Sequence, residues 1–149
     1  MSSIVQVRHA ARVRLAPSAI ALVESARHGL AAAQDEPTSA ARYVGAHLAA
    51  LRAAAAVVAA RAEPSGSRRG RPQSVWELLT KVEPTLREWA AFFAASAAKR
   101  AAAEAGLPRA VSAREADDLL RDAGTFVTLA EGALGIPGRQ ELLPLPTAG

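Results

Sequence analysis

Apolar residues recur at helical spacing along most of the chain, and prolines, glycines and capping residues divide the pattern into segments. The longest uninterrupted segment extends from Arg42 to Arg61. With an advance of about 100° per residue, one stripe falls within about 40° of its reference residue and consists of Val44, Leu48, Leu51, Ala55, Val58 and Ala62. We expect this stripe to face the core and this helix to lie at the centre of a bundle.

Three side chains at the start of this helix lie outside the stripe. On the same wheel His47 is about 60° from Val44, Tyr43 about 100° and Arg42 about 160°, on the opposite face. His47 is therefore predicted at the edge of the core. A histidine in such a position is either a structural residue or part of a site.

Helix start and stop signals predict the other helices. Pro17 suits the first turn of a helix, and Thr38 or Ser39 supplies a cap for the central one. Ser-x-x-Glu capping boxes begin further helices at Ser74 and Ser112. We predict an all-α fold, an antiparallel bundle of four main helices plus one short helix. The long helices are expected near residues 17–36, 38–61, 84–105 and 112–134. The short helix covers about residues 74–82, between the second and the third of them.

The chain of 149 residues is long enough for one domain with its own core. We predict a flexible basic N-terminal arm over residues 1–15, a helical domain over 16–135 and a flexible Pro-rich tail over 136–149. Half of the residues are hydrophobic, mostly alanine, and only 4% are aromatic. Stability must then come from close helix contacts and a few large anchors, predicted to be Trp76, Trp89, Phe92, Phe93 and Phe126.

The residue types present exclude several kinds of chemistry. The chain has no cysteine, so disulfides, zinc–thiolate sites and cysteine nucleophiles are excluded. Its three histidines, His9, His28 and His47, lack the spacing of a metal-binding motif, and we expect neither a metal nor a cofactor. Since no run of 18 apolar residues is free of charges, we expect a cytoplasmic protein without membrane contact.

The charge distribution points to an arginine-rich internal loop. The net charge is +4, and residues 62–73 combine Ser, Gly and Pro with Arg68, Arg69 and Arg71. Such a loop either contacts the phosphates of RNA, DNA or a nucleotide, or is simply solvated. On the predicted last helix, Asp117 and Arg121 are four residues apart, which predicts an ion pair on a solvated surface.

The order of these segments resembles the small HEPN-domain proteins of actinobacteria over about residues 17–135. The pattern runs through Arg42-Tyr-Val-Gly-Ala-His47, the arginine-rich loop, Trp76-Glu-Leu-Leu, Glu88-Trp-Ala-Ala-Phe-Phe and Arg114-Glu-Ala-Asp-Asp-Leu-Leu. The resemblance implies an all-helical bundle, often dimeric. The HEPN family belongs to a superfamily that includes metal-independent endoribonucleases and RNA- or nucleotide-binding modules.

Many of these ribonucleases carry an arginine followed, after four to six residues, by a histidine, and Arg42 and His47 fit that spacing. The resemblance implies that His47 acts as general base or acid on a ribose 2′-hydroxyl or leaving oxygen, and that Arg42 holds the phosphate. On a regular helix the two residues are about 140° apart. They would converge if Arg42 lies in the first turn, or if its partner comes from a second subunit.

The sequence therefore favours a HEPN-like domain that binds RNA or nucleotide phosphates, with metal-independent endoribonuclease activity and a homodimer as further expectations. Arg42, Tyr43 and His47 are its candidate site, and the arginine-rich loop supplies auxiliary phosphate contacts. The alternative is a non-catalytic module that docks a protein partner through alanine-rich faces and exposed aromatic residues.

Overall fold

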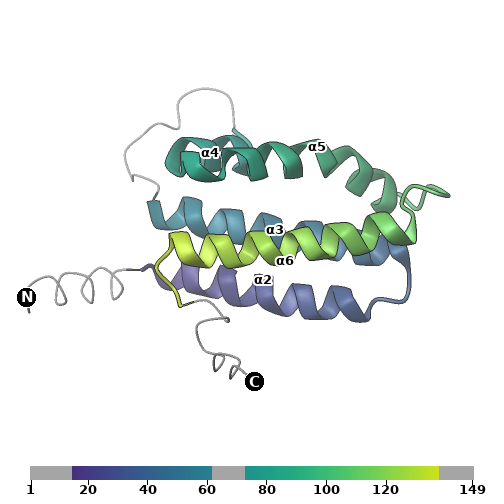
Figure 1. Cartoon of the computed structure of the whole chain (residues 1–149), viewed down its shortest axis with the longest axis horizontal. Coiled ribbons are helices and arrows are strands. Elements are labelled where there is room, and N and C mark those ends of the chain that lie inside the picture. The colour runs from purple at the N-terminus through teal and green to yellow at the C-terminus, as the bar shows by residue number, and fades with distance from the viewer. Residues whose placement is uncertain (1–14, 62–72, 138–149) are drawn as a thin grey trace, which may run out of the picture.

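The computed structural model describes residues 15–61 and 73–137, which form a helical bundle (Figure 1). Its helices are α2 (Pro17–Asp35), α3 (Ser39–Arg61), α4 (Val75–Val82), α5 (Arg87–Glu104) and α6 (Ala113–Ala133), with the 3-10 turn η1 (Pro84–Leu86) before α5. Neither described range contains a strand, and the predicted all-α fold is confirmed. The predicted arm, arginine-rich loop and tail lie almost wholly outside the described residues.

The central position predicted for α3 is also observed. Figure 1 shows α2, α3 and α6 side by side, with α4 and α5 against the other side of α3. α3 contacts each of the other four helices, and α2 and α3 are antiparallel neighbours joined by a short turn (Figure 1). Arg42 and His47 therefore lie on the helix that has neighbours on several sides.

The buried face of α3 is not the predicted one. Leu48 is 37% exposed, and Val44, Leu51, Ala55 and Val58 are only partly buried. The buried residues centre about 145° away on the helix and are Tyr43, Ala46, His47, Ala49, Ala50, Ala53, Ala54, Ala56 and Val57. The predicted stripe is wrong because it followed the larger side chains, whereas neighbouring helices approach α3 most closely over its alanines.

The close approach of α2 to α3 depends on small residues in both helices. A Cβ atom added to Gly45 would lie only 3.0 Å from the Cβ of Ala33. Ala26, Ala33 and Ala49 are all buried. This packing leaves little space between the two helices and fixes the position of the turn that joins them.

The large core residues come mainly from α4, α5 and α6. Phe93 has its ring centroid 5.4 Å from Trp76 in a stacked arrangement and 5.2 Å from Phe126. All three side chains are buried, and Trp89 packs against Phe93 and Phe126 from the edge of the core. Phe92 was predicted as a fifth anchor, but it is 42% exposed.

The predicted helix boundaries are supported by caps. Ser112 and Glu115 form both hydrogen bonds of a capping box, and Ser74 Oγ accepts from the Glu77 amide at 3.1 Å. α5 and α6 each end at a glycine with φ of 74°, Gly106 and Gly135, where paired backbone hydrogen bonds close the last turn. These glycines occupy the left-handed region that other residues adopt only at a cost.

α3 is, among the described helices, the one long and apolar enough by composition to cross a membrane. Half of that apolar segment is buried inside the bundle. This burial fits the core helix of a soluble protein.

Candidate functional site

Arg42 joins three parts of the bundle at the start of α3. The hydroxyl of Thr38 caps this helix by accepting from the Ala41 amide at 3.1 Å. Arg42 Nη1 donates to Asp117 Oδ1 on α6 at 2.7 Å, and Nη2 donates to the Glu36 carbonyl oxygen at 2.9 Å. Its Nε is buried without a hydrogen-bond partner in the described structure.

Asp117 and Arg121, predicted to pair with each other within α6, each pair with other residues. Asp117 pairs with Arg42 from α3. Arg121 lies 3.4 Å from Asp118 and 3.9 Å from Asp122, and it is largely exposed. The predicted pair of Asp117 with Arg121 is therefore wrong, because a partner from another helix takes the carboxylate.

Two adjoining hollows follow the seam between α2 and α6 and together are called the α2–α6 groove. The larger, of about 530 Å³, is lined by Gln34, Arg42, Asp117, Leu120 and Arg121. The smaller, of about 260 Å³, shares Gln34 and Leu120 and continues along α2 to Arg27. The groove therefore carries an arginine from each of α2, α3 and α6.

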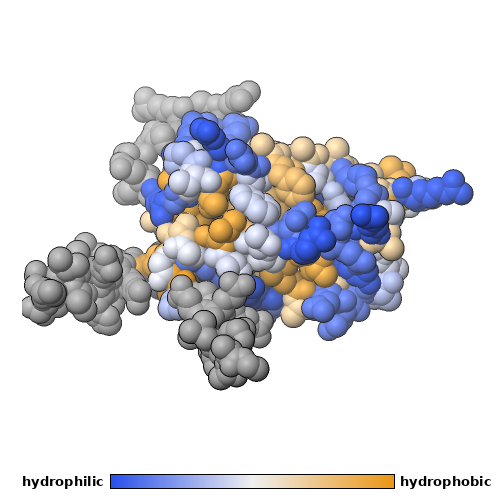
Figure 2. Space-filling model, in the orientation of Figure 1, coloured by the Kyte–Doolittle hydropathy of each residue, from blue (hydrophilic) through white to orange (hydrophobic). Residues whose placement is uncertain are grey.

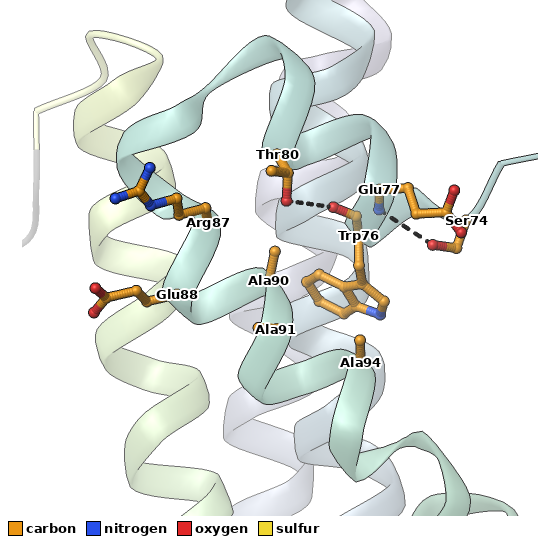
Figure 3. Close-up of a pocket in the computed structure, with 9 residues that line it drawn as sticks. All are labelled: Ser74, Trp76, Glu77, Thr80, Arg87, Glu88, Ala90, Ala91 and Ala94. Atoms are coloured by element: carbon orange, nitrogen blue, oxygen red, sulfur yellow. Dashed lines mark hydrogen bonds between the residues drawn. The ribbon is translucent and has the colours of Figure 1, made fainter.

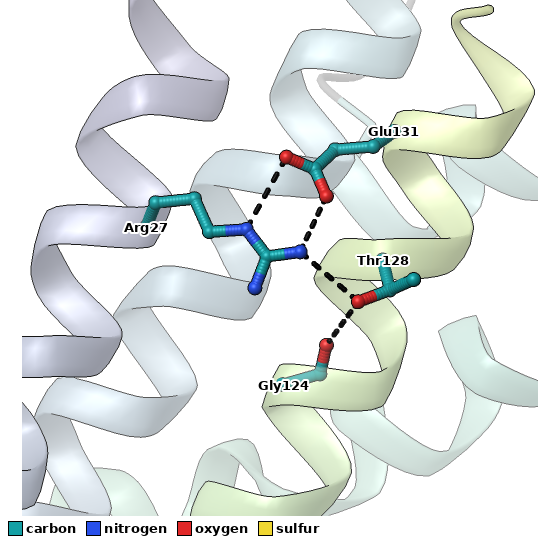
Figure 4. Close-up of polar contacts among 4 residues, drawn as sticks. All are labelled: Arg27, Gly124, Thr128 and Glu131. Carbon is teal, nitrogen blue, oxygen red and sulfur yellow. Dashed lines mark hydrogen bonds and ion pairs between the residues drawn. The ribbon is translucent and has the colours of Figure 1, made fainter. Parts of the chain in front are cut away.

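Arg27 is held in a polar network at the far end of the groove (Figure 4). Its guanidinium pairs with the buried carboxylate of Glu131, with Nε 3.2 Å from Oε2, and Nη2 donates to Thr128 Oγ1 at 3.0 Å. The Thr128 hydroxyl in turn donates to the Gly124 carbonyl oxygen at 3.2 Å (Figure 4). Since these contacts occupy the donors of Nε and Nη2, Arg27 mainly ties α2 to α6.

His47 lies inside the core and is only 1% exposed, so its predicted place at the core edge is wrong. Its Nε2 is 3.0 Å from the carbonyl oxygen of Phe93, and Nδ1 is buried without a partner in the described residues. The rings of Trp76 and Phe93 meet the imidazole edge-on, with centroids 6.1 Å away. In this arrangement the imidazole faces α4 and α5.

Burial also sets the protonation of this region. It lowers the pKa of His47, while the hydrogen bond with the Phe93 carbonyl opposes the shift and Arg100 adds to it. Tyr43 is 5% exposed, and burial raises the pKa of its hydroxyl against an opposing hydrogen bond with Ser96. Both groups are therefore neutral near pH 7, and neither presents its ring to solvent.

The structure separates the predicted site residues. Arg42 points toward α6 and the preceding turn, whereas His47 points toward Phe93, so no contact joins them within one subunit. Arg68, Arg69 and Arg71 lie outside the described residues. Sequence reasoning missed Gln34 and Arg27 as groove residues, because no spacing rule relates them to α6.

A third hollow, of about 550 Å³, lies between α4 and α5 (Figure 3). The Trp76 indole lies beside Ala90, Ala91 and Ala94, and the charged residues Arg87 and Glu88 stand at the start of α5 (Figure 3). Figure 2 shows the contrast on one face of the molecule, with hydrophilic residues over the right-hand part of α6 and apolar residues over the middle of α5. The bundle thus presents surfaces of two different characters.

Residues 32–131, more than half of the chain, match the SAV_6107-like HEPN family. The matched segment begins in the last turn of α2 and ends near the end of α6, and it includes Arg42 and His47. Comparisons with curated proteins and with solved structures gave no match. The match and the all-helical bundle agree, and the chain belongs to the SAV_6107-like HEPN family.

Proposed function

We propose that this protein is a cytoplasmic HEPN-type module that binds RNA or nucleotide phosphates in the α2–α6 groove. The observation that carries the proposal is the state of Arg42. Its guanidinium lines a hollow of about 530 Å³ and keeps one buried N–H without a partner. Guanidinium groups bind phosphate through paired hydrogen bonds, and a guanidinium that lines a hollow and has a donor without a partner favours such a ligand.

Asp117 is the group that a phosphate would displace from Arg42. Its side chain is 63% exposed, so water competes with the ion pair and the pair is weak. Arg121 stands on the same wall with its guanidinium shared between two acids. A phosphate between Arg42 and Arg121 would gain two cationic contacts from two different helices.

The described helices alone do not supply a basic surface. Residues 15–61 and 73–137 contain 11 lysines and arginines and 12 aspartates and glutamates, so the net charge of +4 comes from the other segments. Three of the basic residues in those segments are Arg68, Arg69 and Arg71. In this proposal the groove selects one phosphate, and these arginines strengthen binding to a longer polyanion.

The test is a salt series of binding measurements with a labelled single-stranded RNA of mixed sequence. Arg42→Gln should weaken binding and reduce the slope of log K against log salt concentration by about one, as expected for one lost phosphate contact. Asp117→Asn should strengthen binding, because it removes the competing carboxylate. Arg87→Gln removes an equal charge from α5, outside the groove, and is the matched control. Equal losses for Arg42→Gln and Arg87→Gln would contradict the proposal.

Binding without cleavage is the form of the function that the geometry favours. A metal-independent endoribonuclease needs His47 within reach of a ribose hydroxyl, and here the imidazole is buried against Phe93. We therefore expect RNA incubated with the protein and a chelator to stay intact. Chelator-resistant cleavage that is lost in a His47→Gln variant of equal thermal stability would show that the core opens to form the site.

A second candidate function, docking of a protein partner or a second copy, is favoured by the outer face of α5. Exposed alanines follow this face at helical spacing, at Ala91, Ala94, Ala95, Ala98 and Ala101, together with the partly exposed Phe92. Sedimentation analysis of the purified protein with Ala95→Glu as the matched variant tests it. A dimer that dissociates in the variant would support docking through α5. A monomer in both the unaltered protein and the variant would exclude a homodimer.

A further inference from the structure

A small aromatic pocket lies on the other side of α6 from the α2–α6 groove. It has a volume of about 300 Å³ and is lined by Glu88, Trp89, Phe92 and Asp122, here called the Trp89 pocket. The first three residues come from α5 and Asp122 from α6. Because Asp122 is about 140° around α6 from Asp117, this pocket and the groove open on different faces of that helix.

Two aromatic rings form walls of the pocket at nearly a right angle. The centroids of Trp89 and Phe92 are 6.3 Å apart, and their planes meet at 81°. Phe92 is 42% exposed although it sits in the middle of a long helix. Two rings at this angle border one small volume, and an organic cation in it would make cation–π contact if it lay within about 6 Å of a ring centroid.

Two carboxylates give the same pocket a negative charge. Glu88 is exposed and makes no hydrogen bond or ion pair with the described residues, and it also borders the hollow at Trp76 (Figure 3). Among the described residues Asp122 has one distant cationic neighbour, Arg121 with Nε at 3.9 Å, and that side chain is 69% exposed. The negative charge of the pocket is therefore only weakly compensated within the described protein.

The lining selects an organic cation over a metal ion. Two carboxylates supply only part of the oxygen shell of a divalent cation, and water would have to complete it, while the lining offers no nitrogen or sulfur donors for zinc. In addition, the described residues contain no cluster of three metal-binding side chains. Aromatic faces instead favour weakly hydrated cations such as quaternary ammonium and guanidinium groups.

We propose that the Trp89 pocket binds an organic cation, an alkylammonium or guanidinium group, between its aromatic walls and the carboxylates of Glu88 and Asp122. Cation binding at this site does not require phosphate binding in the α2–α6 groove, although Arg121 of the groove is the cationic neighbour of Asp122. Its volume is sufficient for one such group. The cation would add contacts with both rings and neutralise two acids that face the same space.

The test follows the indole N–H signals of the two tryptophans by NMR during titration of the whole chain. The probes are choline, its neutral carbon isostere dimethylbutanol, and N-acetylarginine amide. We expect at least one cationic probe to shift the Trp89 signal, and the neutral isostere to bind more weakly by about two- to fivefold or more. Binding of choline assigns the site to free ammonium compounds, and binding of the arginine probe assigns it to side chains of a partner.

Three variants complete the test. Glu88→Gln and Phe92→Leu alter exposed positions and should weaken cation binding while the fold is kept. Glu24→Gln, which removes an equal charge from the exposed surface of α2, is the matched control and should leave binding unchanged. Equal shifts with choline and dimethylbutanol, equal losses for Glu24→Gln and Glu88→Gln, or an unmoved Trp89 signal with both cations would overturn the proposal.

Discussion

The imidazole Nε2 of His47 on α3 lies 3.0 Å from the backbone carbonyl oxygen of Phe93 on α5, inside the core. A carbonyl oxygen only accepts hydrogen bonds, so Nε2 carries the proton and the neutral ring leaves Nδ1 with its lone pair. Nδ1 is buried without a partner in the described residues. A second proton there would place a charge in the core with no acceptor for it, which couples stability to pH.

The free energy of unfolding should therefore decrease as the pH falls below the ordinary pKa of histidine. Burial lowers the pKa of His47 in the folded state, so below about pH 6.5 the unfolded chain binds the proton more readily than the folded one. Stability is complete above that pH and declines below it, by up to about 1.4 kcal/mol per pH unit, until the folded-state pKa is reached. Urea unfolding at several pH values between about 7.5 and 5.5 measures this decline.

His47→Gln should remove most of that pH dependence, because glutamine can still donate to the Phe93 carbonyl but does not titrate. His28→Gln is the matched control, since His28 is exposed on α2. Glu115 does not contribute to the change in stability over this pH range, because Lys99 and Ser112 lower its pKa to about 2. An unchanged slope in His47→Gln would contradict the assignment to this ring.

The adjacent residues Phe92 and Phe93 should differ sharply when each is replaced by alanine. Phe93 is fully buried among Trp76, Trp89 and Phe126, so Phe93→Ala should cost about 3–5 kcal/mol through lost contacts and a cavity. Phe92 is 42% exposed, and Phe92→Ala should cost about 1 kcal/mol or less. Paired chemical unfolding curves measure both values, and similar losses for the two variants would show that Phe92 is also a core residue.

These two phenylalanines illustrate why the sequence predicted the helices better than their contacts. The signals for helix ends are local, and Ser74, Ser112, Gly106 and Gly135 indeed stand at caps in the structure. The side of a helix that is buried depends on all of its neighbours. In α3, four neighbouring helices pack mainly against alanines. The size of the apolar side chains along the sequence does not indicate this choice.

The candidate site depended on long-range contacts even more strongly. The spacing of Arg42 and His47 was visible in the sequence, but their directions were set by Asp117, which is 75 residues from Arg42, and by Phe93, which is 46 residues from His47. Trp89 and Glu88 are close in sequence, whereas Asp122 joins them only through the packing of α6. Side chains that meet across helices need the fold before they can be recognised as a group.

Glycine-to-alanine changes should have opposite effects just beyond the end of a helix and within its last turn. Gly106 has a φ of 74°, and Gly106→Ala should destabilise the protein by about 1 kcal/mol or more because alanine disfavours that conformation. Gly132 lies in the last turns of α6 with open space around its Cα, and Gly132→Ala should stabilise by up to about 1 kcal/mol. Thermal unfolding of both variants provides the comparison, and a stabilised Gly106→Ala would contradict the capping role.

The Arg27 and Glu131 pair should behave as a structural tie between α2 and α6 that one mutation breaks. Glu131 has a side-chain exposure of 9%, so Arg27→Leu would leave a nearly buried carboxylate without its cation and should cost about 3 kcal/mol or less, because Arg27 is 26% exposed. In Arg27→Leu with Glu131→Leu no charge is stranded, and part of that loss should be recovered. A double-mutant cycle by chemical unfolding measures the coupling. If the single and double variants lose equal stability, the carboxylate is hydrated in the absence of Arg27, and the tie between the helices is apolar.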